Sequence, residues 1–166
     1  MSRLLKVLCP LLVTAALAMM PMSASATSGA HFFSSSGSVA NSGALQVSWD
    51  EAGVGNAQVN YTLTADSSAL YACINGGGNH PSAKNKQAVA GPLTSPQTGF
   101  NPTNGRVTTT NGISVGPLAS TLICPSGQTF VLACVSYTNV VLSDDTNGVT
   151  TNIADVSRTF VAIKGC

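Results

Sequence analysis

The stretch Thr129 to Asp145 reads Thr-Phe-Val-Leu-Ala-Cys-Val-Ser-Tyr-Thr-Asn-Val-Val-Leu-Ser-Asp-Asp and is the longest β-prone run in the chain. Val, Thr, Phe and Tyr fit the pleated surface of a sheet, so this run predicts a central strand. Its first half is apolar nearly throughout, which predicts burial on both faces, whereas Ser136, Thr138 and Ser143 predict a wetter second half. Residues 144–148, which follow, contain Asn-Gly and predict a hairpin turn.

Shorter runs of alternating apolar and polar residues precede and follow this strand. Residues 43–49 and 58–64 both alternate, and the turn-rich residues between them predict that the two runs form a hairpin. Asp66-Ser-Ser predicts the next turn, and residues 69–74 the next strand. The part of the chain after residue 26 shows no helical period. Further strands are expected at 30–36, 149–151 and 156–164.

Residues 75–128 differ in character from both flanks, because they contain Gly76-Gly77-Gly78, six prolines and only short β-prone pieces. Long irregular excursions are uncommon in compact domains unless they are pinned or functional. We expect the most mobile backbone here, centred on residues 76–86. The whole pattern predicts an all-β fold, a two-sheet antiparallel sandwich of about seven to nine strands.

The N-terminus has the organisation of a secretory signal peptide. Arg3 and Lys6 precede a mostly apolar run, and Ala24-Ser-Ala26 fits the small residues of a cleavage site. The apolar run is shorter than the roughly 18 to 20 residues that span a bilayer, which argues against a retained anchor. We therefore expect residues 1–26 to be removed and residues 27–166 to form a single secreted domain, extracellular or periplasmic.

The charge balance excludes two classes of partner. Without Arg3 and Lys6, five of the seven basic residues remain against six acidic ones. A near-neutral chain offers no electrostatic surface for nucleic acid or for an acidic membrane. Ser, Thr, Asn and Gly supply most of the polar residues, as in many secreted β proteins.

The predicted mature chain contains four cysteines: Cys73, Cys124, Cys134 and Cys166. An even number in an exported chain predicts two disulfides, with three possible pairings. No C-x-x-C spacing occurs and the two histidines are isolated, so a metal site is not expected. A Cys73–Cys124 bond would close the excursion. A simple hairpin at 146–147 would bring Cys166 nearer Cys124, but an interruption at 153–155 favours Cys134 with Cys166.

The motif Gly112-Ile-Ser-Val-Gly116 matches the G-x-S-x-G pattern of serine hydrolases. That pattern requires a strand, a sharp turn and a helix, with an acid and a histidine after the serine. Neither His31 nor His80 follows Ser114, so we interpret the motif as a turn. Residues 144–155 miss most ligand positions of a calcium loop. No catalytic, cofactor-binding or metal-binding residue is predicted.

Two resemblances add to this picture. Residues 67–73, Ser-Ser-Ala-Leu-Tyr-Ala-Cys, resemble the D-[ST]-A-x-Y-x-C signature of immunoglobulin variable domains, although Ser67 replaces the Asp and no cysteine precedes Cys73 after the signal. This implies an immunoglobulin-like architecture outside the true family. Residues 61–65, 71–79, 124–128 and 135–140 resemble small secreted proteins of actinomycetes and other bacteria, a group without an assigned biochemical function. That resemblance favours pairing Cys73 with Cys124.

The sequence favours a non-catalytic secreted protein that binds a partner or contributes to the cell surface or extracellular matrix. The expected partner is extracellular or in the cell wall. One alternative is a small extracellular hydrolase whose site assembles from distant residues, such as His80 with Asp144 or Asp155. Another is a secreted protease inhibitor that presents an exposed rigid loop at 88–98.

Overall fold

The computed structural model describes residues 29–76 and 85–166, and within them the chain forms ten β-strands and no helix. The all-β prediction is confirmed, with one strand more than the expected range. The strands are β1 (His31–Val39), β2 (Leu45–Ala52), β3 (Val59–Asn75), β4 (Lys86–Thr94), β5 (Thr98–Phe100), β6 (Arg106–Thr108), β7 (Ile113–Val115), β8 (Gln128–Asp144), β9 (Val149–Ile153) and β10 (Val156–Thr159).

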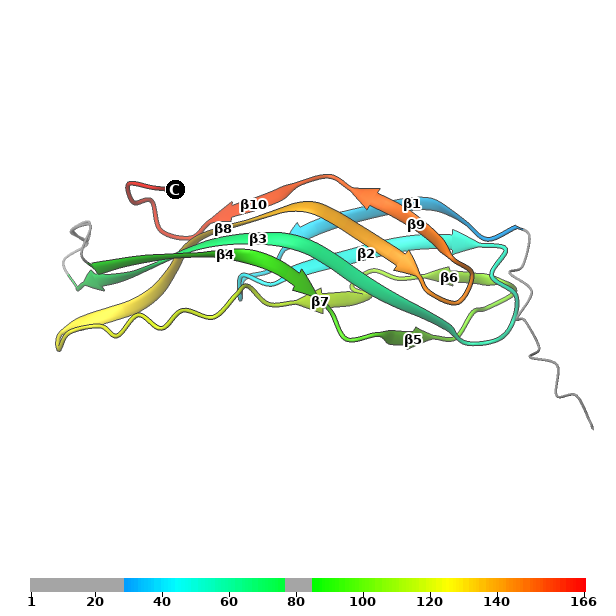
Figure 1. Ribbon diagram of the computed structural model, residues 1–166, viewed down its shortest axis with the longest axis horizontal. Coiled ribbons are helices and arrows are strands. Elements are labelled where there is room, and N and C mark those ends of the chain that lie inside the picture. The colour runs from blue at the N-terminus through cyan, green and yellow to red at the C-terminus, as the bar shows by residue number, and fades with distance from the viewer. Residues whose placement is uncertain (1–28, 77–84) are drawn as a thin grey trace, which may run out of the picture.

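The strands form two antiparallel sheets that pack face to face (Figure 1). Sheet A has the order β1-β2-β6, and β7 also pairs with β2. Sheet B has the order β10-β8-β3-β4, with β5 paired to β3 and β9 paired to β8. The expected two-sheet sandwich is therefore present, and the run that begins at Thr129 is a central strand of the larger sheet.

β3 and β8 are the longest strands, 17 residues each, and they pair along nearly their whole length. Tyr61 lies opposite Asp144 at one end, and Asn75 lies opposite Gln128 at the other. In β2 and in much of β3 and β8, alternate residues are buried because one face of each sheet lies against the other sheet. The buried core includes Leu45, Val47, Trp49, Val59, Tyr61, Leu63, Val135, Tyr137, Val140 and Leu142.

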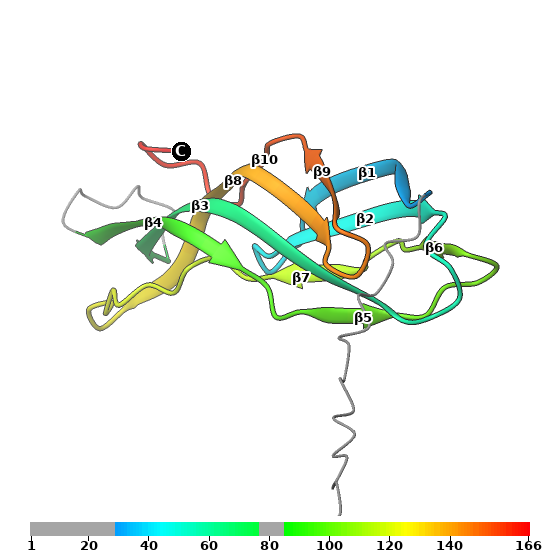
Figure 2. The same ribbon diagram turned by 45° about the vertical axis from the view of Figure 1, so that its right-hand side comes forward.

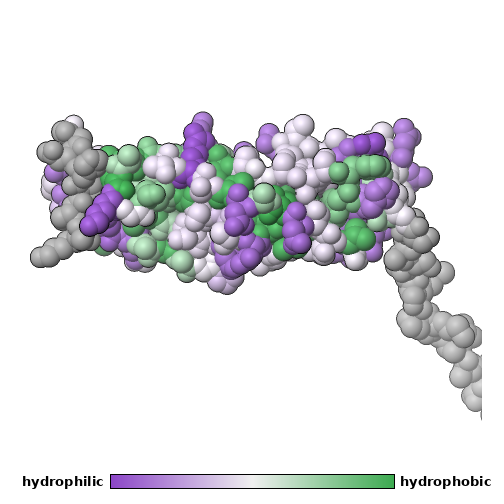
Figure 3. All heavy atoms as spheres, turned by 90° about the horizontal axis from the view of Figure 1, so that it is seen from above, coloured by the Kyte–Doolittle hydropathy of each residue, from purple (hydrophilic) through white to green (hydrophobic). Residues whose placement is uncertain are grey.

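The two sheets are also joined along the edge where β1 faces β9 and β10. The Ser35 and Thr151 hydroxyls are 3.1 Å apart, and Arg158 donates a hydrogen bond to the Val39 carbonyl. The view from above shows apolar side chains interspersed with polar ones along the length of the molecule (Figure 3). A mixed surface of this kind is normal for a protein in water.

β3 and β8 extend well beyond sheet A, and we call this part the arm (Figures 1 and 2). The arm comprises residues 70–75 of β3 and 128–134 of β8. The body is the remainder, in which sheet A covers the inner face of sheet B. No strand of sheet A covers the arm. Two irregular segments cover it instead, one on each face.

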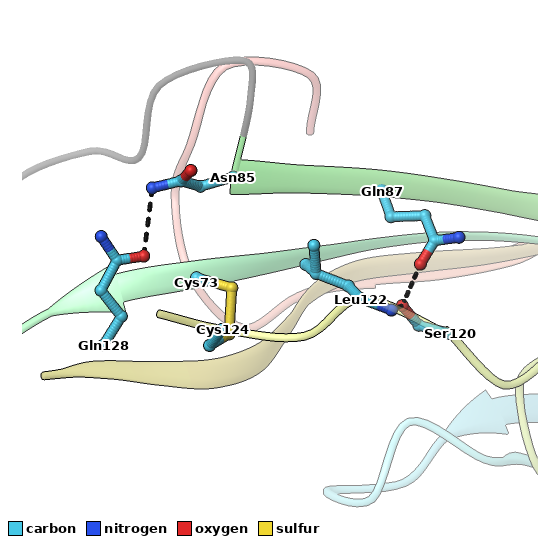
Figure 4. The surroundings of a disulfide bond; sticks show 7 residues. All are labelled: Cys73, Asn85, Gln87, Ser120, Leu122, Cys124 and Gln128. Atoms are coloured by element: carbon cyan, nitrogen blue, oxygen red, sulfur yellow. Dashed lines mark hydrogen bonds between the residues drawn. A yellow bond between two sulfur atoms is a disulfide. The ribbon is translucent and has the colours of Figure 1, made fainter. Parts of the chain in front are cut away.

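Residues 116–127 cover the inner face of the arm. Cys73 is linked to Cys124 in this segment, and the Tyr71 hydroxyl donates a hydrogen bond to the Leu118 carbonyl. Figure 4 shows the disulfide, with Gln128 near the tip of the arm bonded to Asn85. The segment is thus attached to the strands by a covalent bond and by side chains, without a β-ladder.

The C-terminal residues 160–166 cover the outer face of the arm. Ala72, Ala133 and Ile163 form a small second core there. The backbone N–H groups of Phe160 and Val161 both donate to the carbonyl of Ala133, which is the extra residue at a register shift between β8 and β3. Cys134 is linked to Cys166. Both disulfides match the expected pairing, and they lie on opposite faces of the same strand pair.

The expected hairpin between residues 43–49 and 58–64 is wrong. β2 pairs with β1, β6 and β7, whereas β3 belongs to the other sheet. The connection crosses between the sheets through Gly53 and Gly55, both at positive φ. A crossing connection and a hairpin give the same alternating pattern, because either way one face of each strand meets the core.

The predicted turn at Asp66-Ser-Ser is also wrong, because β3 continues through it. A register shift between Thr64 and Asp66 accommodates the polar residues, and Asp66 accepts a hydrogen bond from the Asn139 side chain across the strand pair. Alternation places Ser68 on the outside, where a polar residue needs no turn to reach water.

The burial of β8 differs from the expectation in part, although Ala133 and Val135 in its first half are buried as expected. Thr129 and Phe130 in its first half are exposed, whereas Tyr137 and Leu142 in its second half are fully buried. The first half lies in the arm, where only irregular segments cover it, and the second half lies under sheet A. The turn at 144–148 is present and connects β8 to β9.

The excursion at 75–128 is more ordered than predicted. It contributes β4 and β5 to sheet B, and β6 and β7 to sheet A. β6 and β7 are short because the chain between them passes the Trp49 ring, and a Cβ added at Gly112 would lie 2.2 Å from that ring. Most of the expected mobile centre, residues 77–84, lies outside the described residues.

Candidate functional site

Three serines form a row on the outer face of sheet B. Ser68 of β3 pairs with Ser136 of β8, which in turn pairs with Ser157 of β10. Neighbouring strands lie about 4.8 Å apart, so the row extends about 10 Å across the sheet. The register of the β3–β8 pair places these hydroxyls side by side, because Ser68 and Ser136 are both at outward positions.

A pocket of about 350 Å³ lies over this serine row. Its floor is sheet B, and one wall is the C-terminal segment that the Cys134–Cys166 disulfide holds against the sheet. Both apolar and hydroxyl-bearing residues line it. The lining residues are Ser68, Ala69, Leu70, Ala88, Cys134, Val135, Ser136, Ser157, Arg158, Thr159, Gly165 and Cys166.

The hydroxyls of the serine row have no hydrogen-bond partner among residues 29–76 and 85–166. The hydroxyl of Thr159, beside the row, also has no hydrogen-bond partner among these residues. The one charged residue of the lining is occupied elsewhere, since the Arg158 guanidinium bonds the Val39 carbonyl and lies over the Phe160 ring at 5.0 Å. The pocket therefore presents unpaired hydroxyl donors and acceptors, and its one charged side chain is directed to the Val39 carbonyl and the Phe160 ring.

A second cluster, inside the core, contains two carboxyl groups. Glu51 and Asp144 are fully buried, and the Tyr61 hydroxyl donates a 2.7 Å hydrogen bond to Glu51 Oε2. The pKa of Glu51 is raised to about 7, chiefly because burial disfavours the carboxylate. Asp144 raises this pKa further, whereas the Tyr61 hydrogen bond lowers it. Burial and Glu51 together raise the pKa of Tyr61.

The two carboxyl groups have different structural roles. Asp144 accepts hydrogen bonds from the backbone N–H groups of Thr146 and Asn147 and from the Asn147 side chain, which fixes the turn after β8. Glu51 Oε1 accepts no hydrogen bond within the described part of the chain. The acid form of Glu51 suits this site, because burying a neutral carboxyl group costs less than burying a carboxylate. A carboxyl group that is fully buried in the core cannot contact a substrate. The ionisation of these two groups therefore affects the stability of the fold.

An exposed aromatic group lies on the outer face of sheet A. Phe33 is the extra residue at a register shift between β1 and β2, and its ring is 60% exposed. The Arg106 guanidinium lies 5.0 Å from the ring centre, and the His31 ring lies 4.6 Å away. Arg106 forms an ion pair with Asp50, which lowers the pKa of Asp50 through their hydrogen bonds. The charges of Arg106 and Asp50 in this group are therefore paired with each other.

The structure does not bring together the residues of the hydrolase-like motif. Ser114 is exposed on β7 opposite Gln46, whereas His31 is opposite Ala52 at the other end of β2. Six residues of strand separate the two positions, about 20 Å. Ser114 lies in a strand, so the turn predicted for its motif is wrong. The strand forms because Val47 and Ile113 pair across the sheet and both face the core.

Of the other residues named for a hydrolase, the structure describes Asp144 and Asp155. His80 lies outside the described residues, and its described neighbours Asn75 and Asn85 lie at the opposite end of β3 and β8 from Asp144. Asp155 is exposed between β9 and β10. No group of three or more potential metal ligands occurs in 29–76 or 85–166.

The exposed loop proposed for a protease inhibitor is not a loop. Residues 88–94 belong to β4 and pair with β3. Ser95, which follows, is buried and exchanges hydrogen bonds with the backbone of Leu63. The Val89 and Leu93 side chains pack on the core, which explains why this stretch joins the sheet.

Comparison with known proteins adds no family: no family model, curated protein or solved structure matches the chain. The two resemblances noted in the sequence remain predictions. A search for apolar helices of membrane-spanning length found none in the described residues. The serine row was missed by sequence reasoning, although Ser136 already stood out as a polar residue in the central strand. Pairing register, which brings Ser68 and Ser157 beside it, was the missing information.

Proposed function

We propose that the protein is a secreted, non-catalytic β-sandwich that binds a partner outside the cell or in the cell wall. The pocket on the outer face of sheet B carries the proposal, because it combines unpaired hydroxyls with a wall that a disulfide holds in place. A site supported on strands and fixed by packing loses little freedom on binding. Ligand sites are commonly concave, with a few polar groups that fix orientation.

Export is part of the same proposal. Two disulfides, Cys73–Cys124 and Cys134–Cys166, support it because such bonds persist in oxidising compartments. We expect protein recovered from the culture medium or cell wall to begin at Thr27, which N-terminal sequencing checks. Recovery only in the cytoplasm with Met1 retained would contradict this part.

The binding role is tested by retention on a matrix of cell-wall and secreted fractions. The test compares wild-type residues 27–166 with a pocket variant in which Ser68, Ser136 and Ser157 are all replaced by Ala. A matched control replaces by Ala three exposed serines of β1 whose hydroxyls form no hydrogen bond in the described structure; they are Ser34, Ser36 and Ser38. We expect the pocket variant to lose retention and the control to keep it. Equal retention of all three proteins would rule out this pocket.

The enzyme alternative has its own test. Serine-directed fluorophosphonate probes should not label the folded protein, and Ser114→Ala should leave its melting temperature and its retention unchanged. A nucleophilic serine needs a base in hydrogen-bond reach. Stoichiometric labelling of Ser114 that disappears in His80→Ala would establish an enzyme.

A further inference from the structure

The serine row forms a flat, regular array of hydroxyls. Ser68, Ser136 and Ser157 come from three adjacent strands, so the sheet itself sets their spacing. Each hydroxyl can donate one hydrogen bond and accept two. Because none is used within the described residues, the whole array is available to a ligand.

The charged side chains around the row are hydrogen-bonded to groups outside it. Arg158 is directed to Val39 and Phe160, as described above. Along the strands, Asp66 lies two residues before Ser68 and bonds Asn139, while Lys86 bonds the carbonyl of Lys164. Arg158 is the one charged side chain of the lining, and its guanidinium is directed to the Val39 carbonyl, so the polar groups that the row itself presents to a ligand are neutral hydroxyls.

Apolar atoms complete the pocket beside the hydroxyls. Leu70, Ala88 and the Cys134–Cys166 disulfide line the side next to the C-terminal segment. Gly165, at a φ of 110°, brings that segment against Leu70, since an added Cβ would lie 3.1 Å from the leucine Cδ2. The site thus offers hydroxyls to polar groups and a low apolar wall to C–H groups.

We propose that this pocket binds a neutral saccharide, with the serine row contacting sugar hydroxyls and the apolar wall contacting the ring C–H face. A sugar presents closely spaced hydroxyls that donate and accept, which the row complements, together with apolar C–H groups. The row of about 10 Å suits a short stretch of a polysaccharide rather than a single polar group. The inference rests on the proposed function, because it names the ligand class of that binding site.

The test measures binding of wild-type residues 27–166 to maltohexaose, cellohexaose and chitohexaose by titration calorimetry. Hexagalacturonic acid serves as the acidic comparison. We expect at least one neutral hexasaccharide to bind, and the triple Ala variant of the serine row to bind it at least tenfold more weakly. The triple Ala variant at Ser34, Ser36 and Ser38 should bind like wild type. Melting temperatures of all variants verify that they fold.

A second variant, Ser136→Phe, fills the pocket from its floor and should abolish binding while the outward position leaves the core intact.

Failure of the saccharide inference and failure of the binding function give different results. If no neutral hexasaccharide binds at millimolar concentration, yet wall fractions still retain the protein through the serine row, the ligand class is wrong and the binding site stands. If hexagalacturonic acid bound more tightly than every neutral hexasaccharide, the proposal of a neutral ligand would be refuted. If neither oligosaccharides nor wall fractions depend on the row, both proposals fall.

Discussion

In the body, β3 and β8 are covered by sheet A, and Trp49, Tyr61 and Leu142 fill the space between the sheets. In the arm, the same two strands are covered by residues 116–127 on one face and 160–166 on the other, each linked by one disulfide. The body buries many large side chains, whereas the arm buries Tyr71 on one face and, on the other, a small second core of two alanines and one isoleucine. Little apolar surface is buried there, so the covalent bonds take over part of what packing does elsewhere.

The difference also places the candidate site. The saccharide pocket lies where the serine row meets the C-terminal segment, at the junction of body and arm. A segment without a ladder can leave an open pocket, which a continuous strand would close. The disulfide then fixes the position of the wall.

The largest effect should come from the body. Trp49→Ala removes a 2% exposed side chain whose ring lies 4.8 Å from Tyr61 and 5.0 Å from Phe100. We expect the free energy of unfolding, measured with urea, to fall by about 3 to 5 kcal/mol. Phe33→Ala, at an exposed ring, should change it far less, and equal losses in the two variants would contradict the assignment of the core.

Removing either disulfide should have the next largest effect. The bonds close loops with sequence separations of 51 and 32 residues. The loop-entropy argument gives losses of about 2 to 4 kcal/mol for Cys73→Ala/Cys124→Ala and for Cys134→Ala/Cys166→Ala. Urea denaturation of both double variants measures this. If neither variant lost stability, packing alone would hold the covers of the arm.

Glu51→Gln should change the pH dependence of stability. The pKa of Glu51 is about 7 in the folded state against a reference value of 4.5. Below pH 4.5 both states keep the proton and the stabilisation is complete; as pH rises through 7 it is lost, by about 1 to 3 kcal/mol. Gln cannot ionise, so the variant should be flatter from pH 4.5 to 7 and more stable than wild type at pH 8.

A companion variant sharpens this prediction. Tyr61 lowers the pKa of Glu51 through its hydrogen bond, so Tyr61→Phe should move the pH window upward. Urea denaturation at a series of pH values follows both variants. A wild-type protein whose stability rose between pH 4.5 and 7 would have the opposite sign and would refute a buried acid form of Glu51.

The smallest effect is expected at the surface of the arm. Ile123 is 89% exposed although Cys124 is next to it, whereas Leu122 packs on the core. Ile123→Ser should therefore change the free energy of unfolding by less than about 0.5 kcal/mol, and Leu122→Ser should cost more. The reverse order would mean that residues 116–127 lie on the arm with their other face inward.

Much of this fold could be predicted because alternation and the cysteine count are local features of the sequence. The two-sheet fold and the number of disulfides followed from them, and the central strand followed from its β-prone residues. The pairing needed more: the resemblance to small secreted proteins and the closing of the excursion favoured Cys73 with Cys124, and the interruption at 153–155 favoured Cys134 with Cys166. Sheet membership could not be predicted, since the alternation of β2 is the same whether β3 pairs with it or lies opposite it. The exposure at the start of β8 was missed for a related reason: Phe130 is apolar, but only the extent of sheet A decides whether it is covered.

The candidate site was even less visible in the sequence. Ser68, Ser136 and Ser157 are far apart in the chain, and each is an ordinary outward residue of a strand. Glu51 belonged to a predicted turn, yet it is the inward residue at the end of β2. Both sites depend on registers that long-range pairing sets.

The division into body and arm is tested most directly by hydrogen exchange under native conditions, comparing wild type with Cys73→Ala/Cys124→Ala. We predict that backbone amides of residues 71–75 and 128–133 exchange much faster in the variant through local opening. For the amides of Val47, Leu63 and Leu142 in the body, the exchange rate should change only as much as the change in global stability requires. A uniform acceleration of arm and body together would contradict the account, because it would show that the two regions open as one cooperative unit.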